Sequence, residues 1–203
     1  MLQAINLGCV RGDRRLFEHL NFALHPGEVI ELRGPNGTGK TSLLRILCGL
    51  ASPAEGEIRW QEKNIRTLGE EYHSEIAYLA HQNGVKDELT AIENLRVSSA
   101  LSGTSLRREQ AKEKLAQLGL KDYWDLPARL LSAGQRRRIG LARLLASTAA
   151  LWILDEVLAS LDDAAVTVAR RVITDHLSTG GMAIVATHQE LALPSSQRLD
   201  LGA

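Results

Sequence analysis

Apolar and polar positions follow two rhythms along the chain, and each rhythm predicts its own kind of element. Short apolar or alternating runs predict strands at residues 2–10, 28–33, 56–60, 76–80, 151–154 and 182–187. Apolar residues spaced three and four apart predict helices at 41–50, 90–101, 105–118, 132–146 and 163–178. The first run mixes alternating and apolar character, which favours an edge strand. Strands and helices alternate at both ends of the chain, whereas the middle is helical, so the pattern predicts an α/β protein with a helical insertion.

Length and composition are those of an ordinary globular protein. The 203 residues allow one domain, or one domain with a small subdomain. Basic and acidic residues number 24 each, so the formal net charge is zero, which argues against a general nucleic-acid binder. No apolar run reaches the length of about 18 residues that spans a bilayer, and the start of the chain shows no signal peptide. Two cysteines, Cys9 and Cys48, are too few for a disulfide framework and favour a reduced, cytoplasmic compartment.

Charge is concentrated in one part of the chain. Residues 105 to 145 carry ten basic and four acidic residues, a local balance of +6 that the remaining residues offset. A solvated helical face accounts for such a segment. The alternative is a patch that meets a partner or an anionic membrane surface.

A glycine-rich loop stands between a predicted strand and a predicted helix. It reads GPNGTGKT and matches the pattern G-x-x-x-x-G-K-[ST] of phosphate-binding loops. Its residues are Gly34, Pro35, Asn36, Gly37, Thr38, Gly39, Lys40 and Thr41. The glycines let backbone N–H groups converge on phosphate oxygens, Lys40 reaches the β- and γ-phosphates, and Thr41 binds Mg²⁺. The loop therefore predicts nucleotide binding.

Two adjacent carboxylates follow the apolar run 151–154. Asp155 fits the role of holding the Mg²⁺ shell beside the loop, and Glu156 that of orienting and deprotonating the attacking water. His188 follows the apolar strand 182–187 and is a candidate for contacting the γ-phosphate and the water. A histidine that follows a strand is more often structural, so His188 is a candidate only because it occurs together with the phosphate loop and the acidic pair.

The segment LSAGQ, Leu131–Gln135, admits two interpretations. Ser132 and Gln135 form an S-x-x-Q capping box, which explains a helix start without any ligand. A helix N-terminus with a free hydroxyl and a glycine, Gly134, is also an anion site.

The order of these motifs resembles the ATP-binding-cassette (ABC) ATPases over nearly the whole chain. The motifs are GPNGTGKT, LSAGQ, LWILDE, SLD at 160–162 and Thr187-His188. The resemblance implies a P-loop NTPase ABC fold with a mixed sheet core: one domain, 1–203, with a RecA-like core at about 1–83 and 146–203 and a helical subdomain at about 84–145. It also implies an ATP-sandwich homodimer in which Ser132 and Gly134 act in trans on the γ-phosphate held by the other copy. Gln135 belongs to the nucleotide-binding set, Asp162 links the two sites, and the helical subdomain docks on transmembrane subunits.

Several stretches narrow the resemblance further. HQNGVKDELTAIENL, LSAGQRRRIGLARLLAS and LWILDE, with the short total length, resemble the ATPase subunits of cytochrome c maturation haem-export complexes. Such a subunit sits on the cytoplasmic face of the inner membrane, held there by partner subunits. The resemblance implies ATP and Mg²⁺ as ligands, haem handled by partners and not by this chain, and no direct contact with nucleic acid.

The chain departs from the ABC pattern at three places. Arg11 stands where many ABC ATPases have an aromatic residue that stacks on adenine, and a guanidinium can also stack on a base. Val157 replaces the usual proline after the acidic pair. Register places His81 at the position of the family's metal-contacting glutamine, whereas chemistry favours Gln82, so both remain candidates for contact with the metal-bound water.

Other functions remain as alternatives. One is the ATPase subunit of a different ABC exporter, and another is a soluble ABC ATPase that acts on nucleic acid or ribosomes. The single cassette and the insertion of about 60 residues disfavour the soluble class, which has two cassettes or a long coiled coil. LSAGQ and the acidic pair argue against a small-molecule P-loop kinase.

Overall fold

The structure, a computed structural model, describes residues 1–81, 84–158, 161–188, 190–193 and 195–202. These residues form two compact units. Unit 1 comprises Met1–Tyr78, Ala149–Glu156 and Ile173–Ala203, and unit 2 comprises Leu79–Thr148 and Val157–Val172. The chain therefore passes between the units four times, and each unit is described separately below.

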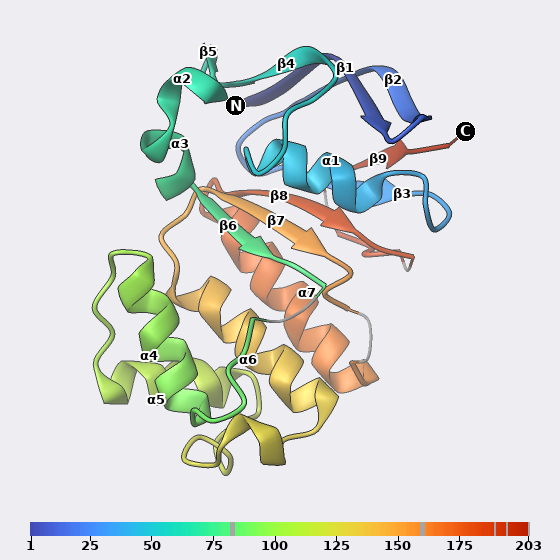
Figure 1. Cartoon of the computed structure of the whole chain (residues 1–203). Coiled ribbons are helices and arrows are strands. Elements are labelled where there is room, and N and C mark those ends of the chain that lie inside the picture. Colours follow the sequence, from blue (N-terminus) through green and yellow to red (C-terminus); the bar gives the residue numbers. More distant parts are fainter. Residues whose placement is uncertain (82–83, 159–160, 189, 194, 203) are drawn as a thin grey trace. The chain divides into compact units, whose positions relative to one another are not determined.

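Unit 1 contains two β-sheets (Figure 1). The four-stranded sheet has the order β2-β1-β4-β5, with antiparallel pairs. Its strands are β1 (Leu2–Arg11), β2 (Arg14–Leu24), β4 (Glu55–Trp60) and β5 (Lys63–Asn64). The five-stranded sheet has the order β6-β7-β8-β3-β9, in which β7, β8, β3 and β9 run parallel. Its strands are β3 (Val29–Arg33), β6 (Ile76–Leu79), β7 (Leu151–Asp155), β8 (Met182–Ala186) and β9 (Ser196–Asp200).

Helix α1 (Lys40–Leu47) lies between the two sheets and forms the centre of the core (Figure 1). Its side chains Leu43, Leu44, Ile46 and Leu47 are almost fully buried and belong to one hydrophobic cluster with residues of both sheets. Because side chains alternate along a strand, Leu151 and Ile153 of β7 join this cluster, whereas Trp152 points to the opposite face. There His176, near the end of α7 (Asp163–Ser178), stacks on Trp152 with ring centroids 3.8 Å apart. Two short helices, α2 (Ile65–Leu68) and α3 (Glu70–Ser74), complete unit 1.

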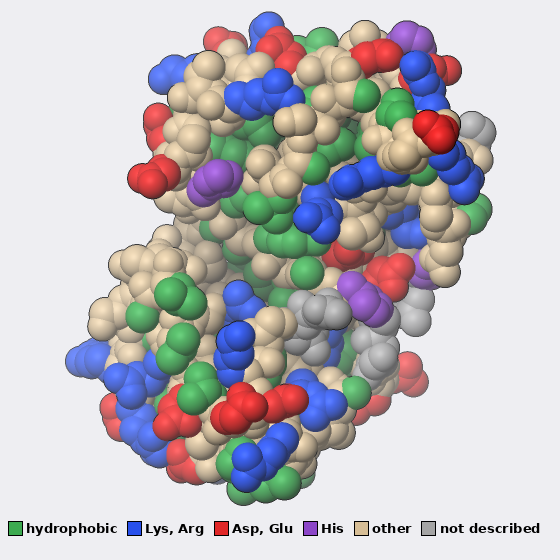
Figure 2. All heavy atoms as spheres, viewed as in Figure 1, with side chains coloured by type: hydrophobic (Ala, Val, Ile, Leu, Met, Phe, Trp, Pro, Cys, Tyr) green, Lys and Arg blue, Asp and Glu red, His purple; other side chains and the backbone are tan. Residues whose placement is uncertain are grey.

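Unit 2 is helical. It contains α4 (Ala91–Leu101), α5 (Arg108–Gln117), the short 3₁₀ helix η1 (Ala128–Leu130), α6 (Ala133–Ala146) and the first part of α7. Capping boxes start α4 at Thr90 and α6 at Ser132, because each serine or threonine hydroxyl accepts a backbone N–H three residues on. Buried Ile92, Leu95, Leu115 and Ile139 fill the space between the helices. Basic and acidic side chains intermingle over the visible face of this unit (Figure 2).

The structure corrects two parts of the strand assignment. The prediction that residues 2–10 form an edge strand is wrong, because β1 pairs with β2 on one side and with β4 on the other. Strands β2, β5 and β9 were not predicted. Strand β9 (SQRLD) is mostly exposed and contains charged residues, and its sequence lacks the apolar run that predicts a buried strand.

A buried carboxylate fastens β9 to β3. Glu31 is 4% exposed; its Oε2 accepts hydrogen bonds from Arg33 (2.5 and 3.2 Å), and its Oε1 accepts one from Ser196 Oγ (2.8 Å). Burial alone raises the pKa of Glu31, but the hydrogen bonds from Arg33 and Ser196 and the Arg33 charge together lower it below its ordinary value of 4.5. A carboxyl with a lowered folded-state pKa stabilises the fold above its unfolded pKa and loses that contribution as pH falls through the folded value.

We therefore expect Glu31→Gln to reduce stability at pH 7 by about 1.5–3 kcal/mol, the range for hydrogen bonds to a charged group. The difference from wild type should begin to shrink below about pH 4.5, where the unfolded carboxyl takes up a proton, and should continue to shrink as pH falls through the lower folded-state pKa of the native carboxyl. Urea unfolding of both proteins across this pH range measures it, with the exposed Glu88→Gln as control. A destabilisation that stays constant from pH 7 to acid pH would contradict the assignment of an ionised Glu31.

Candidate active site

The phosphate loop connects β3 to α1. Gly34 and Gly39 adopt φ angles of 145° and 105°, which residues that carry a side chain rarely adopt. A Cβ on Gly34 would lie 2.3 Å from the carbonyl oxygen of Leu201, so this position also lacks room for a side chain. The loop therefore turns tightly between the end of β3 and the first turn of α1, where backbone N–H groups of the helix start are available for an anion.

Lys40 is held inside this loop. Its side chain is buried, and Nζ donates to the carbonyl oxygens of Gly34 (2.7 Å) and Pro35 (3.2 Å). A cavity of about 230 Å³ opens beside it. The cavity is lined by Leu16, Asn36, Gly37, Gly39, Lys40, Thr41, Ser42 and Glu156. The ammonium, the helix start and the glycine backbone thus border one space, which suits a triphosphate.

The next residue, Thr41, contacts the end of β7. Its hydroxyl donates to Oδ2 of Asp155 (3.0 Å), and Asp155 is 3% exposed. A threonine hydroxyl and a carboxylate are oxygen ligands of the kind Mg²⁺ prefers, and such sites take few protein ligands because phosphates supply others. Within the described ranges no cluster of three or more His, Cys, Asp or Glu suits a metal ion. The donor set is therefore compatible with Mg²⁺.

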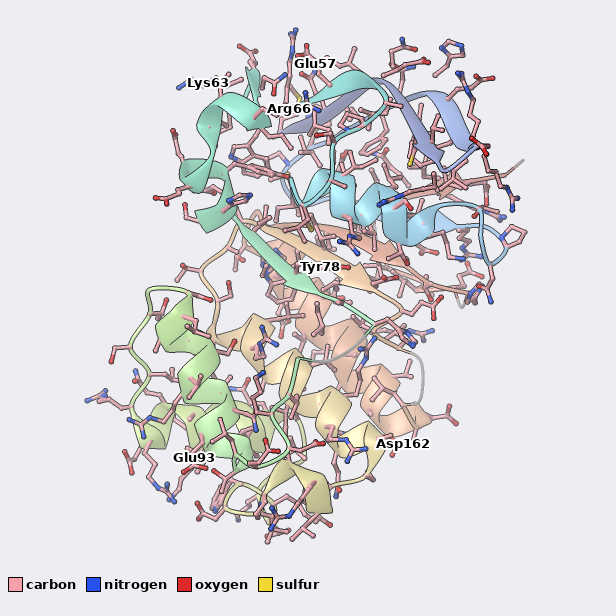
Figure 3. All side chains as sticks on the ribbon, viewed as in Figure 1. Glu57, Lys63, Arg66, Tyr78, Glu93 and Asp162 are labelled. Atoms are coloured by element: carbon pink, nitrogen blue, oxygen red, sulfur yellow. The ribbon has the colours of Figure 1, made fainter. Side chains whose placement is uncertain are left out.

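The Asp155 carboxylate also influences two neighbouring groups. Burial, followed by the charge of Asp155, raises the pKa of the Cys48 thiol to about 12. Burial and then the same charge, with Cys48, raise the pKa of Tyr78 in β6 to about 12 (Figure 3). Both groups are neutral near pH 7, which excludes Cys48 as a thiolate nucleophile. The negative potential that shifts them favours a cation at Asp155.

Glu156 follows Asp155 with an unusual backbone. Its φ of 51° is left-handed, which a glutamate adopts at a cost, and its N–H donates to the carbonyl of Ala186 (2.9 Å). The Oε1 atom lies 3.3 Å from Nε2 of His188, an ion pair when the imidazole is protonated. The carboxylate is about one quarter exposed at the cavity, whereas His188 is about half exposed. The structure thus brings two of the predicted catalytic residues, Glu156 and His188, together and places Glu156 at the edge of the phosphate cavity.

A second cavity, of about 410 Å³, lies within unit 2. It is lined by Gly119, Tyr123, Ser132, Gly134, Gln135, Arg138 and Asp162. Ser132 and Gln135 close their capping box, with hydrogen bonds of 3.1 Å and 2.8 Å. Asp162, at the start of α7 (Figure 3), accepts from Ala165 N (2.7 Å) and pairs with Arg138 (2.8 Å). Three predicted residues of the signature segment Leu131–Gln135 and Asp162, which follows the acidic pair in the chain, therefore line one cavity.

Comparison with known proteins identifies the family. The pattern of the family described as ABC transporter matches residues 17–159. The cytochrome c biogenesis ATP-binding export protein CcmA of Nitrosospira multiformis is 54% identical over 202 residues, which cover 98% of each chain. The chain belongs to the ABC transporter family, among the cytochrome c biogenesis ATP-binding export proteins. It is therefore an ATPase, and its nucleotide is ATP.

Solved structures show that the fold is that of the ABC cassettes. A putative ABC transporter ATP-binding protein from Pyrococcus furiosus superposes with a TM-score of 0.87 at 24% identity and covers 98% of this chain and 96% of its own. A dimeric ATP-binding cassette in a post-hydrolysis state, bound to ADP and Pi, gives a TM-score of 0.86 at 21% identity, with coverages of 100% and 97%. The predicted fold class, an α/β P-loop ABC ATPase with mixed sheets, is confirmed.

Two further candidates of this ABC ATPase, Arg11 and His81, are not among the described residues that line the first cavity. Arg11 is exposed at the end of β1, opposite Arg14, and does not line the cavity as the described residues form it. His81 is exposed, and its carbonyl accepts a hydrogen bond from Arg137. Gln82, the other candidate for the glutamine role, lies outside the described residues, as does Ser160.

Sequence reasoning missed two residues that shape the cavities. Leu16 borders the phosphate cavity from β2, a strand that its charged neighbours concealed. Arg138 holds Asp162 at the second cavity, although in the sequence it is one of three consecutive arginines. Its partner was therefore not identifiable from spacing.

Proposed function

We propose that this ATPase supplies energy, as ATP is hydrolysed to ADP and phosphate, to a membrane complex that exports haem or releases a haem-loaded chaperone in cytochrome c biogenesis. The observation that carries the proposal is the arrangement of Lys40, Thr41 and Glu156 around one cavity, with Asp155 hydrogen-bonded to the Thr41 hydroxyl. The 54% identity to a cytochrome c biogenesis export protein supports the choice of process.

Each candidate residue has a distinct role in this proposal. The glycine loop and Lys40 bind the β- and γ-phosphates, and Thr41 and Asp155, with Gln82 or His81 through water, hold Mg²⁺. When bound, Mg²⁺ neutralises developing phosphate charge. Glu156 accepts the proton of the attacking water, while His188 orients the Glu156 carboxylate and contacts the γ-phosphate. Arg11 contributes to holding adenine by stacking.

A second copy completes the site. We infer a head-to-tail homodimer in which Ser132, Gly134 and Gln135 contact the γ-phosphate bound by the other copy, and in which Asp162 links the two sites. The second cavity supports this inference because Ser132 and Gly134 line it at the start of α6, where backbone N–H groups are available for an anion. Both units then belong to one ABC domain, with a core at about 1–83 and 146–203 and a helical subdomain at about 84–145.

Membrane partners are the third part of the proposal. None of the helices in the described ranges is long and apolar enough to cross a bilayer. We propose that the chain sits on the cytoplasmic face of the inner membrane through transmembrane partner subunits, which also handle haem. The surface of the helical segment 84–130 is the proposed contact, and nucleic acid has no direct role.

Salt extraction tests the mode of attachment. Membranes that contain the partner subunits should retain the chain at about 0.5 M salt, where the Debye length is only about 4 Å and simple attraction to anionic lipid is screened. Charge reversal of exposed Lys121 and Arg129 should release it, and ATP binding should remain intact. Charge reversal of Lys63 and Arg66 in unit 1 (Figure 3) is the matched control. Retention in cells without any candidate partner subunit would contradict the proposal.

A further inference from the structure

Arg137 is a buried arginine in the second turn of α6. It is 4% exposed, whereas arginine is rarely buried unless its guanidinium is well satisfied. Its Nε donates to the carbonyl of Val157 (3.2 Å), and its Nη1 donates to the carbonyls of Ala80 (3.0 Å) and His81 (2.9 Å). All four residues belong to unit 2. One guanidinium thus joins the signature helix α6 to two segments that are distant in sequence.

These two segments adjoin predicted catalytic residues. Ala80 and His81 follow β6 and directly precede Gln82 in the chain, and Val157 directly follows Glu156. They also adjoin the places where the chain enters unit 2, since the first residues of its two segments are Leu79 and Val157. Arg137 therefore fixes, from within unit 2, two of the four points at which the chain passes between the units.

The chemistry of this contact requires a guanidinium. A guanidinium is a rigid planar fork with five N–H donors, so it can satisfy three carbonyl oxygens from fixed directions. A lysine ammonium carries the same charge but concentrates it at one nitrogen, and a glutamine amide has only two N–H donors. Both substitutes leave at least part of the contact unmade, but to different degrees.

We propose that Arg137 is a positioning residue for ATP hydrolysis, which holds the segment ahead of Gln82 and the turn behind Glu156 in a fixed relation to the signature helix. The inference rests on the proposed roles of Glu156 and of the His81–Gln82 segment. The phosphate loop Gly34–Thr41 belongs to unit 1 and forms none of these three hydrogen bonds. Loss of Arg137 therefore affects the hydrolysis step and leaves nucleotide binding intact.

The test separates binding from turnover. For Arg137→Gln, we expect kcat per ATP-binding site to fall about 10²-fold, the effect of displacing reacting groups by about 1 Å. The directly measured ATP Kd should change less than about threefold, since binding of the ground state is not affected. Arg137→Lys should be intermediate, because it keeps the charge without the fork. A purely structural role would lower the number of binding sites but not kcat per site.

The matched control is Arg96→Gln. Arg96 Nε also donates to a backbone carbonyl within unit 2, that of Leu106 (3.1 Å), but it touches neither segment. We expect wild-type kcat per site for this variant. Circular dichroism establishes folding, and if Arg137→Gln does not fold, the comparison is made with Arg137→Lys, which should lose about tenfold.

The outcomes distinguish this inference from the function on which it rests. If Glu156→Gln retains wild-type turnover, the proposed catalytic assignment fails. If Glu156→Gln is inactive while folded Arg137 variants keep wild-type kcat per site, only the positioning role of Arg137 is wrong. A parallel rise in ATP Kd, or an equal loss in Arg96→Gln, would also overturn that role.

Discussion

Replacement of Glu156 by glutamine is expected to reduce ATP turnover by about 10²–10⁴-fold, the contribution of a general base, while ATP still binds. The amide cannot accept the proton of the attacking water, but the substitution leaves Lys40 and the phosphate loop unchanged. The shape of glutamine is close to that of glutamate, so the left-handed backbone at this position (φ 51°) is equally strained in both proteins. Phosphate release and direct nucleotide binding, measured on the same sample, give the two quantities.

The same substitution should stabilise an ATP-bound dimer, because the sandwich is not discharged by hydrolysis. Light scattering with and without ATP detects this change in mass. Glu109→Gln, an exposed glutamate on α5, is the matched control and should hydrolyse ATP as wild type does. Turnover by Glu156→Gln close to the wild-type rate would show that another group activates the water.

Lys40→Ala should lower ATP turnover by a factor of similar size, but it should also weaken ATP binding. Lys40 borders the phosphate cavity and is held by the carbonyls of Gly34 and Pro35, so its ammonium is already in place when the triphosphate arrives. Removal of one preorganised donor of this kind lowers activity about 10²–10³-fold. Loss of affinity should accompany the loss of turnover, because the ammonium pairs with phosphate charge in the bound state as well.

Calorimetric ATP titration of folded Lys40→Ala measures this effect. The side chain bonds to the loop and does not belong to the hydrophobic cluster around α1, so the fold should persist. Lys63→Ala removes an exposed lysine of β5 (Figure 3) and should leave the titration unchanged. An unaltered ATP titration in Lys40→Ala would contradict the placement of the nucleotide at this loop.

The apolar pattern predicted the buried elements and failed at the exposed ones. Strand β7 has five buried residues and α1 has a strong apolar face, so both were evident from the sequence. Strands β2 and β9 carry charged residues at exposed positions, and β9 pairs with β3, which is distant in the chain. The interior position of β1 also depends on β4, which joins the sheet more than 40 residues later. No local signal contains that information.

The sequence motifs predicted the residues of the candidate site but not the arginines that hold neighbouring segments in place. The contact between Thr41 and Asp155 joins two motifs 114 residues apart, and their order along the chain was sufficient to expect it. Arg137 and Arg138 are adjacent in the sequence and chemically identical, yet one bonds to backbone carbonyls and the other to Asp162. The two side chains have different roles because successive residues of a helix point in directions about 100° apart around its axis.

In the proposed function, ATP hydrolysis at Glu156 drives an export step of cytochrome c biogenesis. The most direct measurement is the content of haem-containing c-type cytochromes in cells whose only copy of this chain carries Glu156→Gln at the wild-type protein level. We expect mature c-type cytochromes to be lost, while cells with Glu71→Gln, a change at an exposed glutamate of α3 outside the proposed partner contact, keep the wild-type amount. Wild-type amounts of mature cytochrome in Glu156→Gln cells, with the purified variant unable to hydrolyse ATP, would contradict the account.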